Sequence, residues 1–278
     1  MPRRTPAPRS RRAFLGEFGT GTFALAVFTP LATACGSAES AESTTPITEA
    51  DTTMSTSSTA EPTPTTGDAD NETTTTTPRE VPNDLRWGRA NLGFVSAYVL
   101  ARGNSAAIVD TGTAGSAEAI GQTLASLGLT YDDVGHVILT HKHADHAGST
   151  GEVLELAPMA TVYAGEADLA DLDDFGIDGL VGGEDVFGFE MVATPGHTAG
   201  HMAVIDHKAG LLVAGDAIFT SNGGATEGPQ QFFDDVPESR ESIKRLAQLS
   251  FNTLLVGHGD PLEGNADTAV ADLAASFG

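Results

Sequence analysis

Six consecutive residues, His141 to His146, constrain this chain more than any other part of its sequence. The run His141-Lys142-His143-Ala144-Asp145-His146 holds three imidazoles and one carboxylate, and one threonine separates it from the apolar residues 137–139. A regular helix or strand would point these four side chains in different directions, whereas a tight loop at the end of a strand can direct them to one point. Imidazole nitrogen and carboxylate oxygen suit zinc, and also iron, manganese or nickel. The run therefore predicts a metal-binding loop.

Apolar runs alternate with amphipathic stretches over residues 81–278, and this pattern predicts one α/β domain. About 200 residues are enough to bury a good core. The expected strands cover residues 96–100, 106–109, 136–139, 161–163, 189–193, 202–205, 211–214 and 253–256. The expected helices cover residues 116–127, 149–156 and 237–249, with a short one at 267–276.

Three further polar side chains follow expected strands. His197 lies in a Thr-Pro-Gly-His-Thr sequence after strand 189–193, Asp216 follows strand 211–214, and His258 follows strand 253–256. Together with the first loop they make seven candidate ligands, five imidazoles and two carboxylates. One metal ion needs only three or four protein ligands, so seven predict two metals that share a bridging residue.

The order His-x-His-x-Asp-His, then His197, Asp216 and His258, resembles the metallo-β-lactamase-fold hydrolases over residues 92–261. This resemblance implies an αβ/βα sandwich, a four-layer α/β fold with its metals at one edge between two sheets. It implies two divalent ions, with Zn²⁺ expected first and iron or manganese as alternatives. Carried over by position, the first metal is held by His141, His143 and His197, the second by Asp145, His146 and His258, and Asp216 bridges them.

The same resemblance implies a binuclear hydrolase, in which a metal-bridging hydroxide attacks the carbonyl of a small ester, thioester or lactone. Asp145 is the expected catalytic residue, because it can orient the nucleophile and pass a proton to the leaving group. Asp110, in a Val-Asp-Thr-Gly sequence, matches a further family motif, and we expect it to support the site rather than bind metal.

The residues around Asp216 narrow the family. Gly215-Asp216-Ala217-Ile218-Phe219 is similar to an element of glyoxalase II-type thioesterases, the hydroxyacylglutathione hydrolases. The β-lactam hydrolases usually lack a bridging aspartate here, and acyl-homoserine lactonases often carry tyrosine where Phe219 stands. Glyoxalase II enzymes hold glutathione with a basic C-terminal domain, whereas residues 267–276 contain no Lys or Arg. We therefore expect a compact thioesterase or a lactonase with another substrate.

Two other classes stay open. A mononuclear iron persulfide dioxygenase has the same fold and would need fewer of the seven ligands. Measuring whether the protein contains zinc or iron distinguishes the hydrolase from the dioxygenase. A cell-surface binding protein with a vestigial metal is the other alternative, but it would be expected to have lost a ligand.

The N-terminal region predicts export. Ser10-Arg11-Arg12-Ala13-Phe14-Leu15 is typical of a twin-arginine signal, and residues 1–34 end at Cys35 in a sequence similar to a lipoprotein processing site. Residues 36–80 are rich in Thr, Ser and Pro, which predicts a disordered tether. We expect a protein anchored by lipid at the outer face of the cytoplasmic membrane.

Charge limits the partners. Residues 1–34 hold five arginines and one glutamate, so the rest of the chain carries a net charge of −28, against −24 for the whole. Such acidity is typical of halophilic proteins and opposes binding to nucleic acid or to an anionic membrane surface. We expect a small-molecule substrate, and membrane association only through the lipid.

Several other residues carry weaker expectations. Residues 165–188 and 221–235 are expected to control access to the site, and the acids of the first segment, Asp168 among them, are expected to be solvated. Core positions are expected for Phe175, Phe232 and Phe233, with an apolar acyl pocket as the alternative. His136 is expected to pack in or at the edge of the core, and His201 either to orient the site or to lie on the surface. Solvent is expected around His207 and Lys142.

Overall fold

The structure is a computed structural model, and it describes residues 84–278. The predicted signal sequence, Cys35 and the whole predicted tether, residues 36–80, therefore lie outside the described residues. Within residues 84–278, none of the helices combines the length and the apolarity that crossing a bilayer requires.

The first of two six-stranded sheets has the strand order β1-β2-β3-β4-β5-β6. Its strands are β1 (Arg86–Asn91), β2 (Ser96–Arg102), β3 (Ser105–Val109), β4 (Val134–Ile138), β5 (Thr161–Gly165) and β6 (Asp178–Leu180). The first three strands form an antiparallel meander, and β3 to β6 are parallel to one another.

The second sheet has the order β14-β13-β10-β9-β8-β7. Its strands are β7 (Asp185–Val186), β8 (Phe189–Ala193), β9 (Met202–Asp206), β10 (Leu211–Gly215), β13 (Thr253–Val256) and β14 (Leu262–Glu263). Because β9 is antiparallel to both β8 and β10, and β13 is parallel to β10, the strands β8, β10 and β13 run in one direction. A separate hairpin is formed by β11 (Phe219–Ser221) and β12 (Gly224–Thr226).

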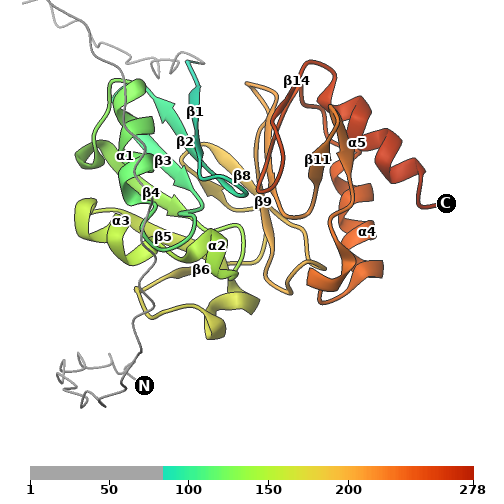
Figure 1. Cartoon of the computed structure of the whole chain (residues 1–278), viewed down its shortest axis with the longest axis horizontal. Coiled ribbons are helices and arrows are strands. Elements are labelled where there is room, and N and C mark those ends of the chain that lie inside the picture. Colours follow the sequence, from blue (N-terminus) through green and yellow to red (C-terminus); the bar gives the residue numbers. More distant parts are fainter. Residues whose placement is uncertain (1–83) are drawn as a thin grey trace, which may run out of the picture. The chain divides into compact units, whose positions relative to one another are not determined.

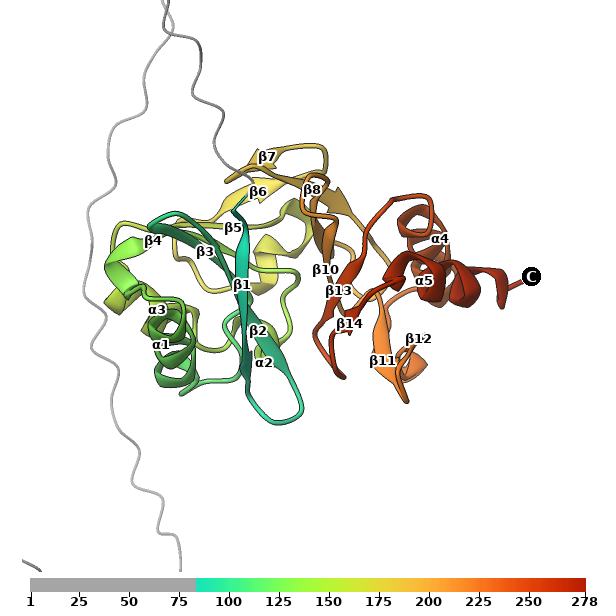
Figure 2. The same ribbon diagram turned by 90° about the horizontal axis from the view of Figure 1, so that it is seen from above.

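Helices cover the outer face of each sheet, as Figures 1 and 2 show. The α-helices are α1 (Ala117–Ser126), α2 (Ala144–Ala147), α3 (Thr150–Leu156), α4 (Val236–Leu246) and α5 (Ala266–Ala275). Short 3₁₀ helices cover Tyr131–Asp133, Glu166–Asp171 and Gln230–Phe232. With α1 and α3 outside the first sheet and α4 and α5 outside the second, the layers follow the order α, β, β, α. The predicted αβ/βα sandwich is confirmed.

Strand alternation divides the core into three apolar layers. In β2, Val99 faces the layer beneath α1, while Leu100 faces the layer between the sheets. In β9, Val204 faces that central layer and Ile205 the layer beneath α4 and α5. Successive side chains of a strand point to opposite faces, so each buried strand contributes to two layers at once. This explains why these strands appear in the sequence as nearly continuous apolar runs.

The eight predicted strands and the predicted helices are present, with ends that differ by up to three residues. The strands that the sequence did not indicate, such as β1 and the two-residue β7, are polar or very short. One prediction was wrong: the metal-binding run is not wholly a loop, because residues 144–147 form the helical turn α2. Asp145 and His146 therefore extend from a helical turn, while His141 and His143 extend from the loop before it.

A buried ion pair joins the two sheets. Arg102, at the end of β2, places Nη2 2.6 Å from Asp206 Oδ2 at the end of β9, and the Asp206 side chain is only 2% exposed. The guanidinium also lies 4.7 Å from the centre of the Phe189 ring. The other carboxylate oxygen of Asp206 accepts hydrogen bonds from the backbone N–H groups of Lys208 and Ala209. Removal of Arg102 would leave this buried carboxylate without its cation.

We expect Arg102→Met to lower the free energy of unfolding by about 3 kcal/mol, because it leaves the buried carboxylate of Asp206 without a positively charged partner. The control is Lys244→Met on α4, where the ion pair with Glu241 is largely exposed and should be worth less than about 1 kcal/mol. Urea unfolding in concentrated KCl measures both. Equal, small losses for the two variants would show that the pair between the sheets contributes little.

Candidate metal centre

The predicted ligands come together because of strand direction. The parallel strands β3 and β4 end at one edge of the first sheet, and β8, β10 and β13 end at one edge of the second. Backbone hydrogen bonds join the two edges, from Met202 N to Thr140 O at 2.8 Å and from Ser96 N to Gly257 O at 2.9 Å. Loops that are far apart in the sequence thereby converge on one place.

The first half-site contains His141, His143 and His197. The Nδ1 atom of His143 lies 3.1 Å from His141 Nε2 and 2.9 Å from His197 Nε2. His141 and His197 are buried, and His143 is partly exposed. Three imidazole nitrogens therefore face one point.

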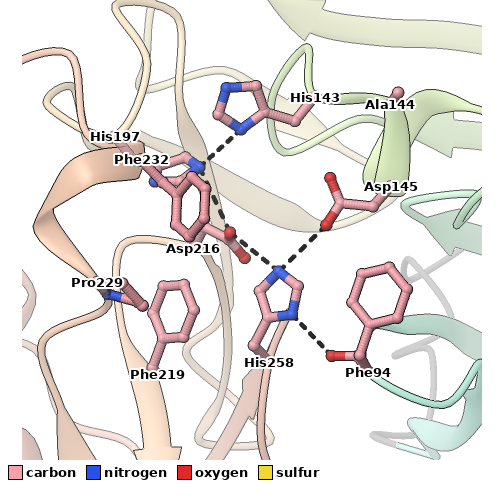
Figure 3. Close-up of a pocket in the computed structure, with 10 residues that line it drawn as sticks. All are labelled: Phe94, His143, Ala144, Asp145, His197, Asp216, Phe219, Pro229, Phe232 and His258. Atoms are coloured by element: carbon pink, nitrogen blue, oxygen red, sulfur yellow. Dashed lines mark hydrogen bonds and ion pairs between the residues drawn. The ribbon is translucent and has the colours of Figure 1, made fainter.

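The second half-site contains Asp145, His146 and His258. The Nε2 atom of His258 lies 3.4 Å from Asp145 Oδ2 and 3.4 Å from His146 Nε2. His146 is fully buried, whereas Asp145 and His258 are partly exposed. In Figure 3 the side chains of Asp145 and His258 point toward each other across the site.

Asp216 lies between the half-sites. Its Oδ2 atom is 3.4 Å from His197 Nε2 and 3.2 Å from His258 Nε2, and its Oδ1 atom is 3.2 Å from His146 Nε2. A Cβ atom on Gly257 would collide with Asp216 Oδ1, so glycine at that position leaves room for the carboxylate. This placement matches the bridging role that the resemblance implies.

The donor set fits two divalent cations. Ligand atoms that bind one zinc ion at 2.0–2.1 Å with tetrahedral angles lie about 3.3 Å apart. The separations within the half-sites, 2.9 and 3.1 Å in the first and 3.4 to 3.8 Å in the second, are close to that value. Asp216 Oδ1 is buried and accepts no hydrogen bond, although His146 Nε2 lies 3.2 Å away, and a cation between the two atoms would be its partner. The structure thus brings all seven predicted ligands together, and their individual roles as ligands stay a prediction.

The two half-sites differ in protonation. Burial lowers the pKa of His141 well below its usual value and that of His197 to about 4, so both imidazoles are neutral and can bind a cation. Burial also acts to lower the pKa of His258, but the contacts with Asp145 and Asp216 outweigh it and raise that pKa to about 10. A cation that binds to His258 must therefore displace a proton.

The carboxylates stay ionised for related reasons. The contact with His258 lowers the pKa of Asp145. Burial acts to raise the pKa of Asp216, but the neighbouring His146 outweighs it and holds that pKa well below its usual value. Both acids are thus present as anions, the form that binds a divalent cation.

Asp110 supports the site, as expected from the motif. One carboxylate oxygen accepts a hydrogen bond from Thr140 N at 2.7 Å, and the other lies 2.8 Å from His146 Nδ1. This contact leaves His146 Nε2 free to face the half-site. Asp110 itself has a left-handed backbone, with φ of 61°.

His201 orients the site, and the surface alternative was wrong. Its side chain is buried, with Nδ1 2.7 Å from Thr194 Oγ1. Its Nε2 atom accepts a hydrogen bond from Asp216 N at 3.0 Å. His201 therefore holds the backbone that carries the bridging carboxylate.

The remaining polar residues behave differently. His136 is partly buried beside Tyr163 and Phe187, as predicted for a packing residue. His207 is exposed but lies 2.7 Å from Glu190, and Lys142 contacts Asp171 at 2.6 Å, so each has an acidic partner as well as solvent.

Asp168 was predicted to be solvated, and this was wrong. Its side chain is fully buried in the 3₁₀ helix after β5. One oxygen accepts hydrogen bonds from Lys142 N at 3.1 Å and Thr198 Oγ1 at 2.7 Å, and the other accepts from Gly200 N at 2.9 Å. A side chain on Gly200 would collide with Asp168, so the close approach requires glycine there.

Asp168 thus joins the loop that carries His141 and His143 to the loop that carries His197. One signal in the sequence was available: Asp168 follows a buried strand, as every predicted ligand does. It was hidden among the acids of residues 165–188, most of which do lie at least partly exposed.

An open cavity of about 530 Å³ lies beside the half-sites. It is lined by Phe94, His143, Ala144, Asp145, His197, Asp216, Phe219, Pro229, Phe232 and His258 (Figure 3). Residues 221–235 contribute to its wall as predicted, but residues 165–188 do not, and that part of the prediction was wrong. Phe94, at the turn between β1 and β2, was not anticipated.

The three phenylalanines considered from the sequence differ in position, and Phe175 and Phe233 are partly buried. Phe232 is 58% exposed and lines the cavity, so the expected core position was wrong. Phe233 packs edge-on against the His197 ring, with ring centres 4.9 Å apart. Phe175 approaches Gly151 on α3 and takes no part in the cavity wall.

Comparison with known proteins identifies the family. The sequence profile of the Metallo-beta-lactamase superfamily matches residues 90–258. This protein belongs to that superfamily. The uncharacterized protein YobT of Bacillus subtilis is 30% identical over 196 residues, which cover 59% of this chain and 83% of YobT.

Glyoxalase II-type enzymes are also among its relatives. The hydroxyacylglutathione hydrolase of Erwinia tasmaniensis is 35% identical over 124 residues, which cover 43% of this chain and 45% of that enzyme. The chain thus spans about half the length of this relative. Among solved structures, the metallo-beta-lactamase family protein TTHA1429 of Thermus thermophilus has a TM-score of 0.55 and 25% identity, covering 69% of this chain and 79% of that one.

We expect Asp216→Ala to bind about one metal ion per chain where the unaltered protein binds about two, because the carboxylate between the half-sites is lost. His207→Ala, on the exposed turn after β9, serves as the control and should keep the full metal content. Elemental analysis after gel filtration measures both. Unchanged metal in the Asp216 variant would contradict the binuclear arrangement.

We expect Asp168→Ala to weaken zinc binding by about ten- to a hundredfold, the usual effect of losing a residue that orients ligands. It should also lower the free energy of unfolding by about 3 kcal/mol, because two backbone N–H groups lose their buried acceptor. Competition with a chromophoric chelator measures the affinity. The exposed Asp173→Ala, in the same segment, is the control, and equal zinc affinity in the two variants would contradict the role of Asp168.

Proposed function

We propose that this protein is a binuclear metal-dependent hydrolase of a small ester, thioester or lactone. The observation that carries the proposal is the pair of half-sites joined by Asp216 and open to a cavity through Asp145 and His258. Two divalent ions bound there would make water nucleophilic near neutral pH and polarise the carbonyl that it attacks.

The residues of the chain would supply orientation and proton transfer. Asp145 lines the cavity with a side chain that is 28% exposed, so its carboxylate can accept a proton from the attacking water and return one to the leaving group. Asp110 and His201 hold His146 and the Asp216 backbone in place. The Phe94 carbonyl, 2.7 Å from His258 Nδ1, does the same for His258.

The relatives support hydrolysis of a thioester. Hydroxyacylglutathione hydrolases are among the relatives, but the chain spans only about half of the Erwinia enzyme. Its own substrate is therefore part of the proposal. The sequence of residues 10–35 further leads us to propose that the protein is exported and held at the cell surface by lipid.

A hydrolysis screen tests the proposed function. The full chain, in concentrated KCl with defined metal, should hydrolyse at least one of a set of thioesters, lactones and aryl esters. Activity should fall at least a hundredfold after removal of metal by a chelator and return with zinc. Asp145→Asn should lower kcat by about a hundredfold or more, the typical contribution of a positioned acid or base.

Two results would contradict the proposal. One is the absence of hydrolysis by protein that elemental analysis shows to be fully loaded. The other is purification with a single iron per chain and consumption of oxygen with a persulfide, which would favour the dioxygenase alternative.

A further inference from the structure

We propose that the cavity takes a substrate whose acyl group is apolar and uncharged, an inference that rests on the proposed hydrolase function. The composition of the cavity wall is the first argument. Every polar side chain that lines it is one of the seven predicted ligands, and the rest of the wall consists of Phe94, Phe219, Pro229, Phe232 and Ala144. Once the ligands hold metal, no other lining side chain is left to bind a polar group of the substrate.

The apolar wall reaches the predicted metal ligands themselves. The rings of Phe94 and Phe219 are stacked with the imidazole of His258, with ring centres 6.0 and 5.1 Å away and planes inclined by only 12°. Figure 3 shows Phe94 on one side of His258 and Phe219 with Pro229 on the other. A carbonyl placed at the half-sites would therefore have its neighbouring substituent against phenyl rings.

This wall is open to solvent in the structure. Phe94 is 65% exposed and Phe232 is 58% exposed, and both belong to the same cavity. Large apolar side chains grouped on an otherwise acidic surface lose contact with water only when something apolar covers them. A cavity of about 530 Å³ is within the usual size range for small-molecule sites.

Charge argues against an acidic substrate. None of the ten lining residues is Lys or Arg. Of the cations in neighbouring segments, Lys142 contacts Asp171 at 2.6 Å and Arg240 contacts Glu227 at 2.8 Å. A carboxylate on the acyl group would thus meet an apolar wall with no counter-charge, and it would lose its hydration without compensation.

The test compares two acyl groups of equal length on one neutral thiol, N-acetylcysteamine. The hexanoyl thioester has an apolar end, and the adipoyl thioester carries a carboxylate at the same position. We expect kcat/KM to rise about fourfold for each methylene from acetyl to hexanoyl, the effect of burying one CH₂ group. Adipoyl should be hydrolysed at least tenfold less efficiently than hexanoyl.

Variants connect this preference to the wall. Phe232→Ala should flatten the dependence on chain length, and Phe232→Leu should restore most of it. Phe94→Ala should have the same effect with unchanged metal content, because the backbone carbonyl that contacts His258 remains. Met159→Ala, an exposed apolar residue outside the cavity, is the control and should leave the whole series unchanged.

The outcomes separate this inference from the proposed function. More efficient hydrolysis of the adipoyl than of the hexanoyl thioester would contradict the apolar specificity. A dependence on chain length that Phe232→Ala leaves unchanged would also contradict it. Neither result would contradict the proposed hydrolase function. If loaded protein hydrolyses none of the thioesters, calorimetric binding of hexanoate and adipate decides the specificity, and the proposed function fails only if lactones and aryl esters are also left intact. Binding of adipate as tight as that of hexanoate would overturn the apolar specificity.

Discussion

The buried carboxylate of Asp216 is the constraint on which the site depends. It stands within 3.4 Å of three imidazoles, those of His146 on the helical turn α2 and of His197 and His258 on two separate loops. A negative charge in that position stabilises several imidazoles and metal cations close together in a buried site, because it offsets the repulsion between their positive charges. The surrounding structure serves to hold it, through the His201 ring that accepts its backbone N–H and the glycine at position 257.

The two sheets and the metal centre depend on each other. Strands of each sheet end at a shared edge, and the ligand loops leave from those ends. Asp168 then joins two of the loops, and the Arg102–Asp206 pair joins the sheets through β2 and β9. Because buried charges of this kind are costly when unpaired, each also specifies how the layers align. The positions of the predicted ligand side chains therefore depend on contacts that lie well away from the metal centre.

Much of the fold and the candidate site could be predicted from the sequence. Apolar runs are clear where a strand is buried on both faces, which is why β13 was predicted with the observed ends. Short strands on the sheet edges have no such pattern and were missed. The helical turn α2 was missed because four residues are too few to show a helical period. Asp168 and Phe94 were misjudged or overlooked because burial and exposure are properties of the neighbours, and a single residue type does not reveal them.

The sequence by itself determined the chemistry available to this protein: five imidazoles and two carboxylates, each placed after a strand, in an order typical of one superfamily. Residue identity and spacing are enough for that, since donor atoms and strand ends are local properties. Only the tertiary structure decided which of these atoms face one another and what surrounds them. Stacking on His258 brings together Phe94 and Phe219, which are 125 positions apart in the sequence, so no local pattern could contain it. The apolar wall, and with it the inferred specificity, exists only once the two sheets have met.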